Sequence, residues 1–174
     1  MKYSRKLFNE TEYLHSIFKY NGLNEELQKK KKKFIPEIPP KLIDYDQELF
    51  TKFFPKDKDV EFKNLQLSNI GVYSITDPSK AQLISDIIKN EFTESDNLII
   101  TDATANMGGN TINFAQNFKH VHSVEIIDLH CSILKNNLKE YNLLDKVTIH
   151  CGDYLDLMDT ITQDIVFFDP PWGG

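Results

Sequence analysis

The sequence predicts an α/β protein in which a parallel β-sheet is wound as β-α-β units. Three observations predict it: short apolar runs typical of buried parallel strands, stretches of helical character between them, and the regular alternation of the two. The predicted strands are 98–102, 121–125, 147–150 and 165–169. In a sheet of this kind, ligands bind outside the carboxyl ends of the strands.

Helical segments are expected before and between these strands. Asp77-Pro78 opens the first, with Thr76 or Asp77 as the N-cap and the proline in the first turn. The preceding segment, 73–76, is expected to be extended. The expected apolar face of the first helix consists of Leu83, Ile84, Ile87 and Ile88. Two more helices are expected, one from Gly108-Gly109 to about Asn117 and one from about Leu129 to Tyr141.

The two parts of the chain differ in charge. The net charge of −6 combines +3 over residues 1–70 with −9 over residues 71–174. We therefore expect a basic, mainly helical N-terminal extension over 1–70 and an α/β domain over 71–174. The expected elements of the extension are a helix over 10–33, a Pro-rich linker over 34–40 and a short helix around Tyr45 to Phe54. The lysine run 29–33 is either a patch that contacts phosphates or a solvated helix end.

Composition excludes several classes of protein. No apolar run approaches the ~20 residues that a membrane span requires, and the polar start lacks the apolar stretch of a secretory signal. Cys131 and Cys151 make no disulfide framework, so reduced thiols are expected. These features predict a cytoplasmic or nuclear protein without membrane contacts. Richness in Lys, Asn and Ile suggests an AT-rich genome, such as that of a virus or a protist.

The loop after the first predicted strand, 102–110, has the composition of a ligand-binding turn. Gly108 and Gly109 allow positive φ and close approach of the backbone to a ligand, and Asn106 tolerates the left-handed region. Asp102 offers a carboxylate that can meet a cationic part of a ligand through water. The loop lacks the G-x-G-x-x-G pattern of dinucleotide-binding proteins. On its own, such a loop is as consistent with a turn that binds nothing.

Two acids at the next strand ends make a ligand site more specific. Glu125 lies 23 residues after Asp102, at the position where nucleoside-binding β-α-β folds place an acid that holds both ribose hydroxyls. An acid there favours an unphosphorylated ribose. Asp153, in the segment 151–154, can accept a hydrogen bond from an adenine amino group. Together the three strand ends predict a nucleoside site, although Glu125 alone is better explained as an exposed side chain.

The segment Asp169-Pro170-Pro171-Trp172 follows the fourth predicted strand and indicates the chemistry. Two prolines fix the backbone and remove two N–H donors, so the segment presents carbonyl oxygens beside the Asp169 carboxylate. Such acceptors suit an exocyclic amine, whose two protons they hold while its lone pair faces an electrophile. Trp172 offers a face for base stacking, worth about 1–3 kcal/mol in comparable contacts. An activated sulfonium methyl group then requires positioning rather than a strong base.

With these motifs in place, residues 73–174 resemble the trimethylguanosine synthase family of RNA cap guanine-N2 methyltransferases, which have a Rossmann-like class I fold. The resemblance runs through six blocks: Tyr73-Ser74-Ile75-Thr76, Asp102-Ala103, Gly108-Gly109-Asn110-Thr111-Ile112, Glu125-Ile126 with Asn136-Asn137, Cys151-Gly152-Asp153-Tyr154-Leu155 and Pro170-Pro171-Trp172-Gly173-Gly174. It implies S-adenosylmethionine as cofactor and a capped RNA as partner. Trp172 would stack on 7-methylguanine, whose positive charge strengthens the contact.

The residue chemistry and the resemblance together predict three sets of site residues and no metal. The cofactor would contact Thr76, Asp102, Ala103, Thr104, Gly108, Asn110, Thr111, Glu125, Asp153 and Tyr154. The catalytic set would be Asp169, Pro170, Pro171 and Trp172. The substrate would contact Ser74, Trp172, Lys29, Lys30 and Lys31.

The sequence departs from the family pattern in three ways. Asp169 stands where the family usually has serine, and Asp-Pro-Pro-Trp is also the form seen in N6-adenine methyltransferases. Asn106 replaces a glycine. The family's sheet has seven strands, whereas this chain stops after the fourth, which would leave that strand as an unprotected edge. We therefore expect a missing C-terminal segment or a further polypeptide to complete the sheet, and poor methylation by residues 1–174 alone.

Other functions remain open on the sequence alone. A zinc site could use His120, His122, His130, Cys131, His150 and Cys151, but their spacing fits no compact zinc pattern. An NAD-dependent dehydrogenase requires the absent G-x-G-x-x-G pattern. A non-catalytic cap- or RNA-binding module would keep Trp172 and the lysines but would need neither Glu125 nor Asp153.

Overall fold

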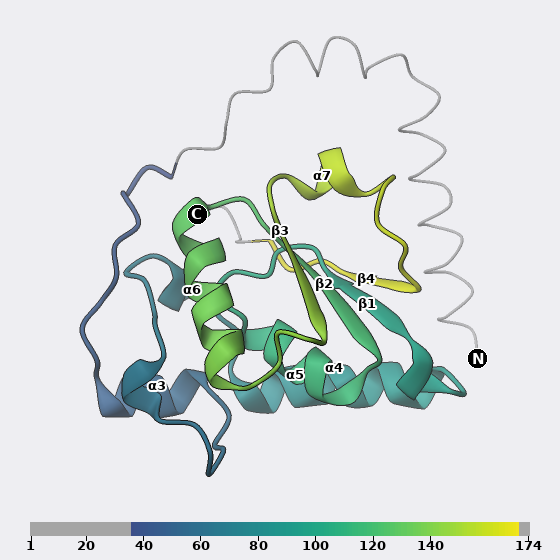
Figure 1. Cartoon of the computed structure of the whole chain (residues 1–174), viewed down its shortest axis with the longest axis horizontal. Helices are drawn as coiled ribbons and strands as arrows, with labels where there is room; N and C mark the ends of the chain where they lie inside the picture. The colour runs from purple at the N-terminus through teal and green to yellow at the C-terminus, as the bar shows by residue number, and fades with distance from the viewer. Residues whose placement is uncertain (1–35, 171–174) are drawn as a thin grey trace, which may run out of the picture. The chain divides into compact units, whose positions relative to one another are not determined.

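The computed structural model describes residues 36–170 (Figure 1). Predictions for the helix over 10–33, the lysine run and Trp172 concern residues outside this range. The described helices are α3 (Gln47–Phe53), α4 (Pro78–Glu91), α5 (Gly109–Asn117), α6 (Asp128–Glu140) and α7 (Tyr154–Leu157). The described strands are β1 (Ile99–Asp102), β2 (His120–Glu125), β3 (Val147–Cys151) and β4 (Ile165–Phe167).

The four strands form one sheet in the order β3-β2-β1-β4, and every neighbouring pair is parallel. Ile100 of β1 lies opposite Val121 of β2 and Ile165 of β4. This arrangement confirms the predicted Rossmann-like α/β fold. Because β2 and β4 lie on opposite sides of β1, strand order reverses at β1. In open α/β sheets, ligands bind in the crevice at such a point.

The core lies between the sheet and the helices that connect its strands. Figure 1 shows α4 and α5 together along one side of the sheet, and α7 beyond the opposite side. Phe114 of α5 is fully buried and meets the ring of Phe167 of β4 edge-on, with ring centroids 5.5 Å apart. Leu134 and Leu138 of α6 are also fully buried in this core. Burial of this apolar face holds the helices against the strands.

The segment before α4 differs from its predicted conformation. Gly71–Tyr73 forms a 3-10 helix, so the expectation of an extended chain over 73–76 is wrong at its start. The carbonyl oxygen of Gly71 accepts hydrogen bonds from the N–H groups of Ser74 (3.1 Å) and Ile75 (3.0 Å). The N–H of Gly71 donates to the hydroxyl of Ser68 over 2.9 Å. These contacts curl the chain where the β-branched residues alone favour extension.

Helix α4 begins as predicted, although its buried face differs. The Asp77 carboxylate caps the helix by accepting from the N–H groups of Ser79 and Lys80, both over 3.1 Å, and Pro78 is the first helical residue. Ala81 and Ser85 are the buried residues of α4. Leu83 and Ile87, predicted to face the core, are 59% and 55% exposed. Small side chains at 81 and 85 let α4 approach α5 closely. Leu83 and Ile87 therefore lie on the side of α4 that faces away from the core.

Residues 36–70 share one compact unit with the sheet, and this unit begins at Pro36. Phe50 and Phe54 are buried, and the hydroxyl of Tyr141 at the end of α6 donates to the carbonyl oxygen of Pro55 over 2.6 Å. The Asn137 amide donates to the carbonyl oxygen of Gln66 and accepts from its N–H. Part of the expected extension over 1–70 is therefore packed against α6.

Cys131 and Cys151 form a disulfide, so the expectation of reduced thiols is wrong. Cys131 lies in the first turns of α6, and Cys151 ends β3. Their Cα atoms are 6.0 Å apart because β3 pairs with β2, whose carboxyl end leads into α6. Among residues 36–170, no helix combines the length and apolar character needed to cross a membrane.

Reduction of this disulfide is expected to lower the free energy of unfolding by about 2–4 kcal/mol, because it releases a constraint on the unfolded chain. The bond joins residues separated by 20 positions. Urea unfolding with and without dithiothreitol measures the change. The double variant Cys131→Ser, Cys151→Ser serves as the control and should unfold identically in both buffers. Equal unfolding midpoints for the unmodified chain with and without reductant would contradict the prediction.

Candidate nucleoside-binding site

The carboxyl ends of β1 and β2 bring the predicted site residues together. Asp102 ends β1 and lies opposite Ser123 of β2. Glu125 follows Ser123 by two residues and ends β2. Both acids are almost completely buried, with 1% and 7% of their surfaces exposed. Asp153 follows β3, the next strand in the sheet. The predicted gathering of polar groups at this edge is present in the structure.

Asp102 is held by a chain of hydroxyl groups. Its Oδ2 accepts from the Thr111 hydroxyl over 2.7 Å, and the hydroxyls of Thr111 and Ser123 are 2.9 Å apart. Because Thr111 gives its only hydroxyl proton to Asp102, Ser123 donates to Thr111. Oδ1 of Asp102 is buried without a hydrogen-bond partner among the described residues. Burial raises the pKa of Asp102 to about 7, an effect that the Thr111 hydroxyl and the Thr104 N–H partly oppose.

The turn after β1 needs two residues with positive φ. Asn106 has a φ of 50°, as expected for an asparagine that replaces glycine, and Gly108 has a φ of 105°. At Gly109 the backbone lies close to another segment of the chain. A Cβ at Gly109 would lie 2.6 Å from the backbone oxygen of Thr76, so the missing side chain makes room for the chain before α4.

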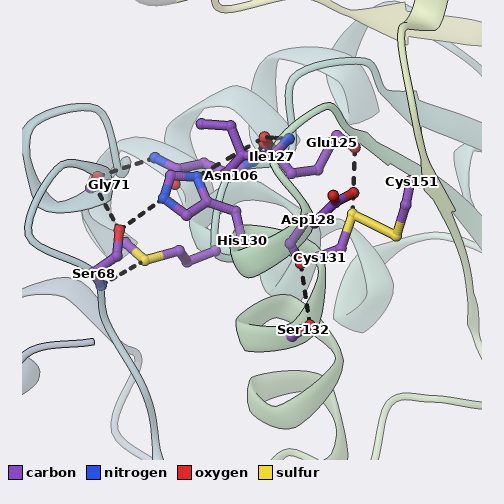
Figure 2. Close-up of polar contacts among 11 residues, drawn as sticks. Ser68, Gly71, Asn106, Glu125, Ile127, Asp128, His130, Cys131, Ser132 and Cys151 are labelled. Carbon is purple, nitrogen blue, oxygen red and sulfur yellow. Dashed lines mark hydrogen bonds and ion pairs between the residues drawn. A yellow bond between two sulfur atoms is a disulfide. The ribbon is translucent and has the colours of Figure 1, made fainter. Parts of the chain in front are cut away.

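Backbone N–H groups fix the Glu125 carboxylate. Oε2 accepts from the N–H of Asn106 and Oε1 from the N–H of Ile127, each over 2.8 Å (Figure 2). Burial raises the pKa of Glu125, while these N–H groups and that of Ile126 lower it. A carboxylate has about four acceptor positions, so Glu125 retains acceptor capacity for a ligand.

Thr76 and Asn110 close the edge of the site next to α5. The Asn110 amide donates to the Thr76 hydroxyl over 2.9 Å, and Oδ1 of Asn110 is buried without a partner among residues 36–170. An unpaired buried acceptor costs about 1–3 kcal/mol. Two such oxygens, one on Asn110 and one on Asp102, suit a ligand that donates hydrogen bonds. Ser74, which was expected to contact the substrate, is exposed.

The remaining predicted residues lie at the ends of β3 and β4. Asp153 caps the short helix α7, where its Oδ1 accepts from the N–H of Leu155 over 2.9 Å. The ring of Tyr154 packs edge-on against Phe168, with centroids 5.9 Å apart. The N–H of Asp169 donates to the Thr104 hydroxyl over 3.0 Å, which brings the start of the Asp-Pro-Pro-Trp segment to the turn after β1. Lys29 to Lys31, Pro171 and Trp172 lie outside the described residues.

Sequence reasoning missed Ser68 and Gly71, which lie far from the predicted motifs, and gave His130 only a place in a zinc set. In the structure, the Ser68 hydroxyl is 2.7 Å from Nε2 of His130. A Cβ at Gly71 would approach the Met107 side chain to 2.5 Å. The only available signal was the histidine five residues after Glu125, which alone indicates little.

The histidines and cysteines that could have formed a zinc site have other partners in the structure. Nδ1 of His122 lies 3.1 Å from Nε2 of His150. His130 contacts Ser68, and the two cysteines are bonded to each other. Within residues 36–170, no group of three or more His, Cys, Asp or Glu side chains is arranged to hold a metal ion.

Comparison with known proteins shows sequence similarity to one family. Residues 97–174 match a family described as RNA cap guanine-N2 methyltransferase. The chain is 32% identical over 144 residues to an uncharacterized protein of Acanthamoeba polyphaga mimivirus, covering 70% of this chain and 56% of that protein. It is 32% identical over 166 residues to the trimethylguanosine synthase of Schizosaccharomyces pombe, covering 87% of this chain and 64% of that enzyme.

The chain therefore spans less than two thirds of the length of these two curated relatives. Among solved structures, an O-methyltransferase of Bacillus cereus is 19% identical, with a TM-score of 0.47 over 53% of this chain and 44% of that one.

Replacement of Asn106 by alanine should lower the free energy of unfolding by about 2 kcal/mol, because it combines left-handed backbone strain with a lost hydrogen bond. The lost bond is the one from the Asn106 amide to the Gly71 carbonyl oxygen, at 3.0 Å. Asn142→Ala is the matched control, since Asn142 also has positive φ (54°) but lies at an exposed turn. Asn106→Gly should recover the backbone part of the loss. An Asn106→Ala variant no less stable than Asn142→Ala in urea unfolding would contradict this account.

Proposed function

Because the chain belongs to the RNA cap guanine-N2 methyltransferase family, we propose that it transfers a methyl group from S-adenosylmethionine to the exocyclic N2 amine of 7-methylguanosine in an RNA 5′ cap. The observation that carries the proposal is the gathering of Asp102, Glu125 and Asp153 at the carboxyl ends of adjacent strands, next to the start of the Asp-Pro-Pro-Trp segment. A cap-binding module without catalysis would need neither Glu125 nor Asp153.

The cofactor's donors match the acceptors of the site. The free acceptor positions of Glu125 would take the ribose hydroxyls, as acids at the end of a second strand do in nucleoside-binding folds. The unpartnered oxygens of Asp102 and Asn110 suit an ammonium group, directly or through water. Asp153 is assigned to the adenine amino group. Ala103 and Gly108 belong to the turn after β1, and the Thr111 hydroxyl and the Thr104 N–H hold Asp102.

The segment Asp169-Pro170-Pro171-Trp172 is assigned to the methyl acceptor. S-adenosylmethionine supplies an already activated methyl group, so these residues would orient the amine, accept its hydrogens and exclude water. Trp172 would stack on the cationic 7-methylguanine. Ser74 and the lysines 29–31 are assigned to the cap and the RNA phosphates. The bond between the Asp169 N–H and Thr104 supports this arrangement, because it ties the acceptor segment to the turn that holds Asp102.

Two alternatives rest on specific residues. Asp169 in place of serine favours adenine N6 as the methyl acceptor, since Asp-Pro-Pro-Trp is the form typical of those enzymes. A cap- or RNA-binding module without catalysis would depend on Trp172 and the lysines. We also propose that a C-terminal segment or a further polypeptide pairs with β4. Among the described strands, β4 pairs only with β1, and Val166 and Phe168 are 39% and 52% exposed.

Methyl transfer to three substrates tests the proposal. The substrates are a 7-methylguanosine cap dinucleotide, its unmethylated counterpart and an adenine-rich RNA, each incubated with S-adenosylmethionine and analysed by mass spectrometry. We expect a mass gain on the 7-methylated cap alone, and its loss in Trp172→Ala because the stacking surface is removed. A form extended at its carboxyl end is assayed in parallel with residues 1–174. Transfer to adenine would instead establish the first alternative, and cofactor binding without any transfer would favour the binding module.

Affinity for S-adenosylhomocysteine should rise with pH between 6 and 8. The pKa of Asp102 in the free protein is raised to about 7, so its carboxyl is largely protonated at pH 6 and charged at pH 8. An ammonium group binds the charged form, so the dissociation constant should fall by up to about tenfold over this range. Isothermal titration calorimetry at both pH values measures it. Asp102→Asn should flatten the dependence, and an equally steep profile in that variant would show that another group is responsible.

A further inference from the structure

Glu125 and four other residues form a ring of polar contacts (Figure 2). Oε2 of Glu125 accepts from the Asn106 N–H, whose side-chain amide donates to the Gly71 carbonyl oxygen. The Gly71 N–H donates to the Ser68 hydroxyl, which lies 2.7 Å from Nε2 of His130. Nδ1 of His130 then faces Oε1 of Glu125 over 3.9 Å. The ring thus joins the 3-10 turn before α4, the turn after β1 and the start of α6.

The ring is shielded from solvent. Ser68 is completely buried, and His130 and Glu125 are 4% and 7% exposed. In such surroundings, a polar atom that loses its partner does not find water instead. The geometry of each member is therefore set by its neighbours in the ring.

The contacts indicate which nitrogen of His130 carries the proton. Burial lowers the pKa of His130 to about 4, so the ring is neutral near pH 7 and has one N–H. A proton on Nε2 would leave the Nδ1 lone pair facing the Glu125 carboxylate, which is unfavourable. The proton therefore belongs on Nδ1, where it points at Glu125, and the Ser68 hydroxyl donates to Nε2.

The order serine, histidine, acid is also that of hydrolytic triads. The Ser68 hydroxyl, however, is fully buried and already accepts from the Gly71 N–H. No substrate carbonyl can reach it in this arrangement. The three residues therefore act on structure rather than as a nucleophile and its base.

We propose that His130 is a positioning residue that orients the Glu125 carboxylate for the two ribose hydroxyls of the cofactor. This inference rests on the proposed function. At 3.9 Å the Nδ1–H of His130 attracts Oε1 of Glu125 electrostatically without forming a hydrogen bond. Through Ser68 and Gly71, His130 also supports the Asn106 residue whose N–H binds Oε2. Both oxygens are thereby held in one orientation, and their remaining lone pairs keep a fixed direction toward the ligand.

The test separates ribose recognition from binding in general. S-adenosylhomocysteine and its 2′,3′-dideoxyribose analogue are titrated by calorimetry into the unmodified protein and four variants. His130→Leu removes both nitrogens at similar volume, whereas His130→Gln keeps an acceptor for Ser68 and a donor for Glu125. Ser68→Ala opens the ring on its other side. His122→Leu is the matched control, because His122 pairs with another histidine, His150, outside the ring.

We expect the unmodified protein to prefer the ribose ligand by about tenfold or more, which corresponds to hydrogen bonds to a charged group. His130→Leu should reduce this preference by about fivefold and leave the affinity for the dideoxy analogue unchanged. Ser68→Ala should have a smaller effect in the same direction, while His130→Gln and His122→Leu should retain most of the preference. In methylation assays, KM for the cofactor should rise in His130→Leu with little change in kcat.

Two results would overturn the inference while leaving the proposed function intact. One is an unchanged ribose preference in both His130→Leu and Ser68→Ala. The other is an equal loss of affinity for both ligands, which would indicate general damage; circular dichroism and thermal unfolding of each variant identify it. Failure of the unmodified protein to bind either ligand would refute the proposed function, and the inference with it.

Discussion

Parallel pairing of β1 with β2 on one side and β4 on the other determines where Asp102, Glu125 and the start of the Asp-Pro-Pro-Trp segment lie. The pairing aligns Asp102 with Ser123 and with Phe167, so the turns that follow the strands leave the sheet at one edge. The N–H of Ala105 then donates to the Val124 carbonyl oxygen over 2.8 Å, which draws the turn after β1 toward Glu125. A shift of one residue between β1 and β2 would move each side chain to the opposite face of the sheet and dissolve this gathering.

The site is built from buried polar side chains inside an otherwise apolar core. Asp102, Thr111 and Ser123 are each 1% exposed or less, and hydrogen bonds link them in series. Buried networks of this kind hold their members in one arrangement, because every alternative rotamer loses a hydrogen bond. The acceptors that remain without partners are therefore presented in fixed positions. A preorganised site of this type need not reorganise when a ligand binds.

Local sequence signals predicted the fold well, and long-range contacts account for the features they missed. The strand runs and the Asp77-Pro78 start of α4 depend on neighbouring residues, and they appear within a residue or two of the expected positions. The buried face of α4 depends instead on its approach to α5, which the pattern of Leu83 and Ile87 cannot reveal.

In the candidate site, too, local signals were predictable and long-range contacts were not. Asp102, Glu125 and Asp153 could be found because strand ends are visible in the sequence, whereas Ser68 and His130 are 62 residues apart and meet only in the folded chain.

The contact between Gly109 and Thr76 constrains how the sequence can change in evolution. Position 109 has no room for a side chain while the backbone of Thr76 lies against the start of α5. In descendants of this gene, an insertion or deletion between positions 71 and 76 would relax selection on the glycine. The residue at position 109 and the length of the segment between positions 71 and 76 should therefore vary together across a lineage.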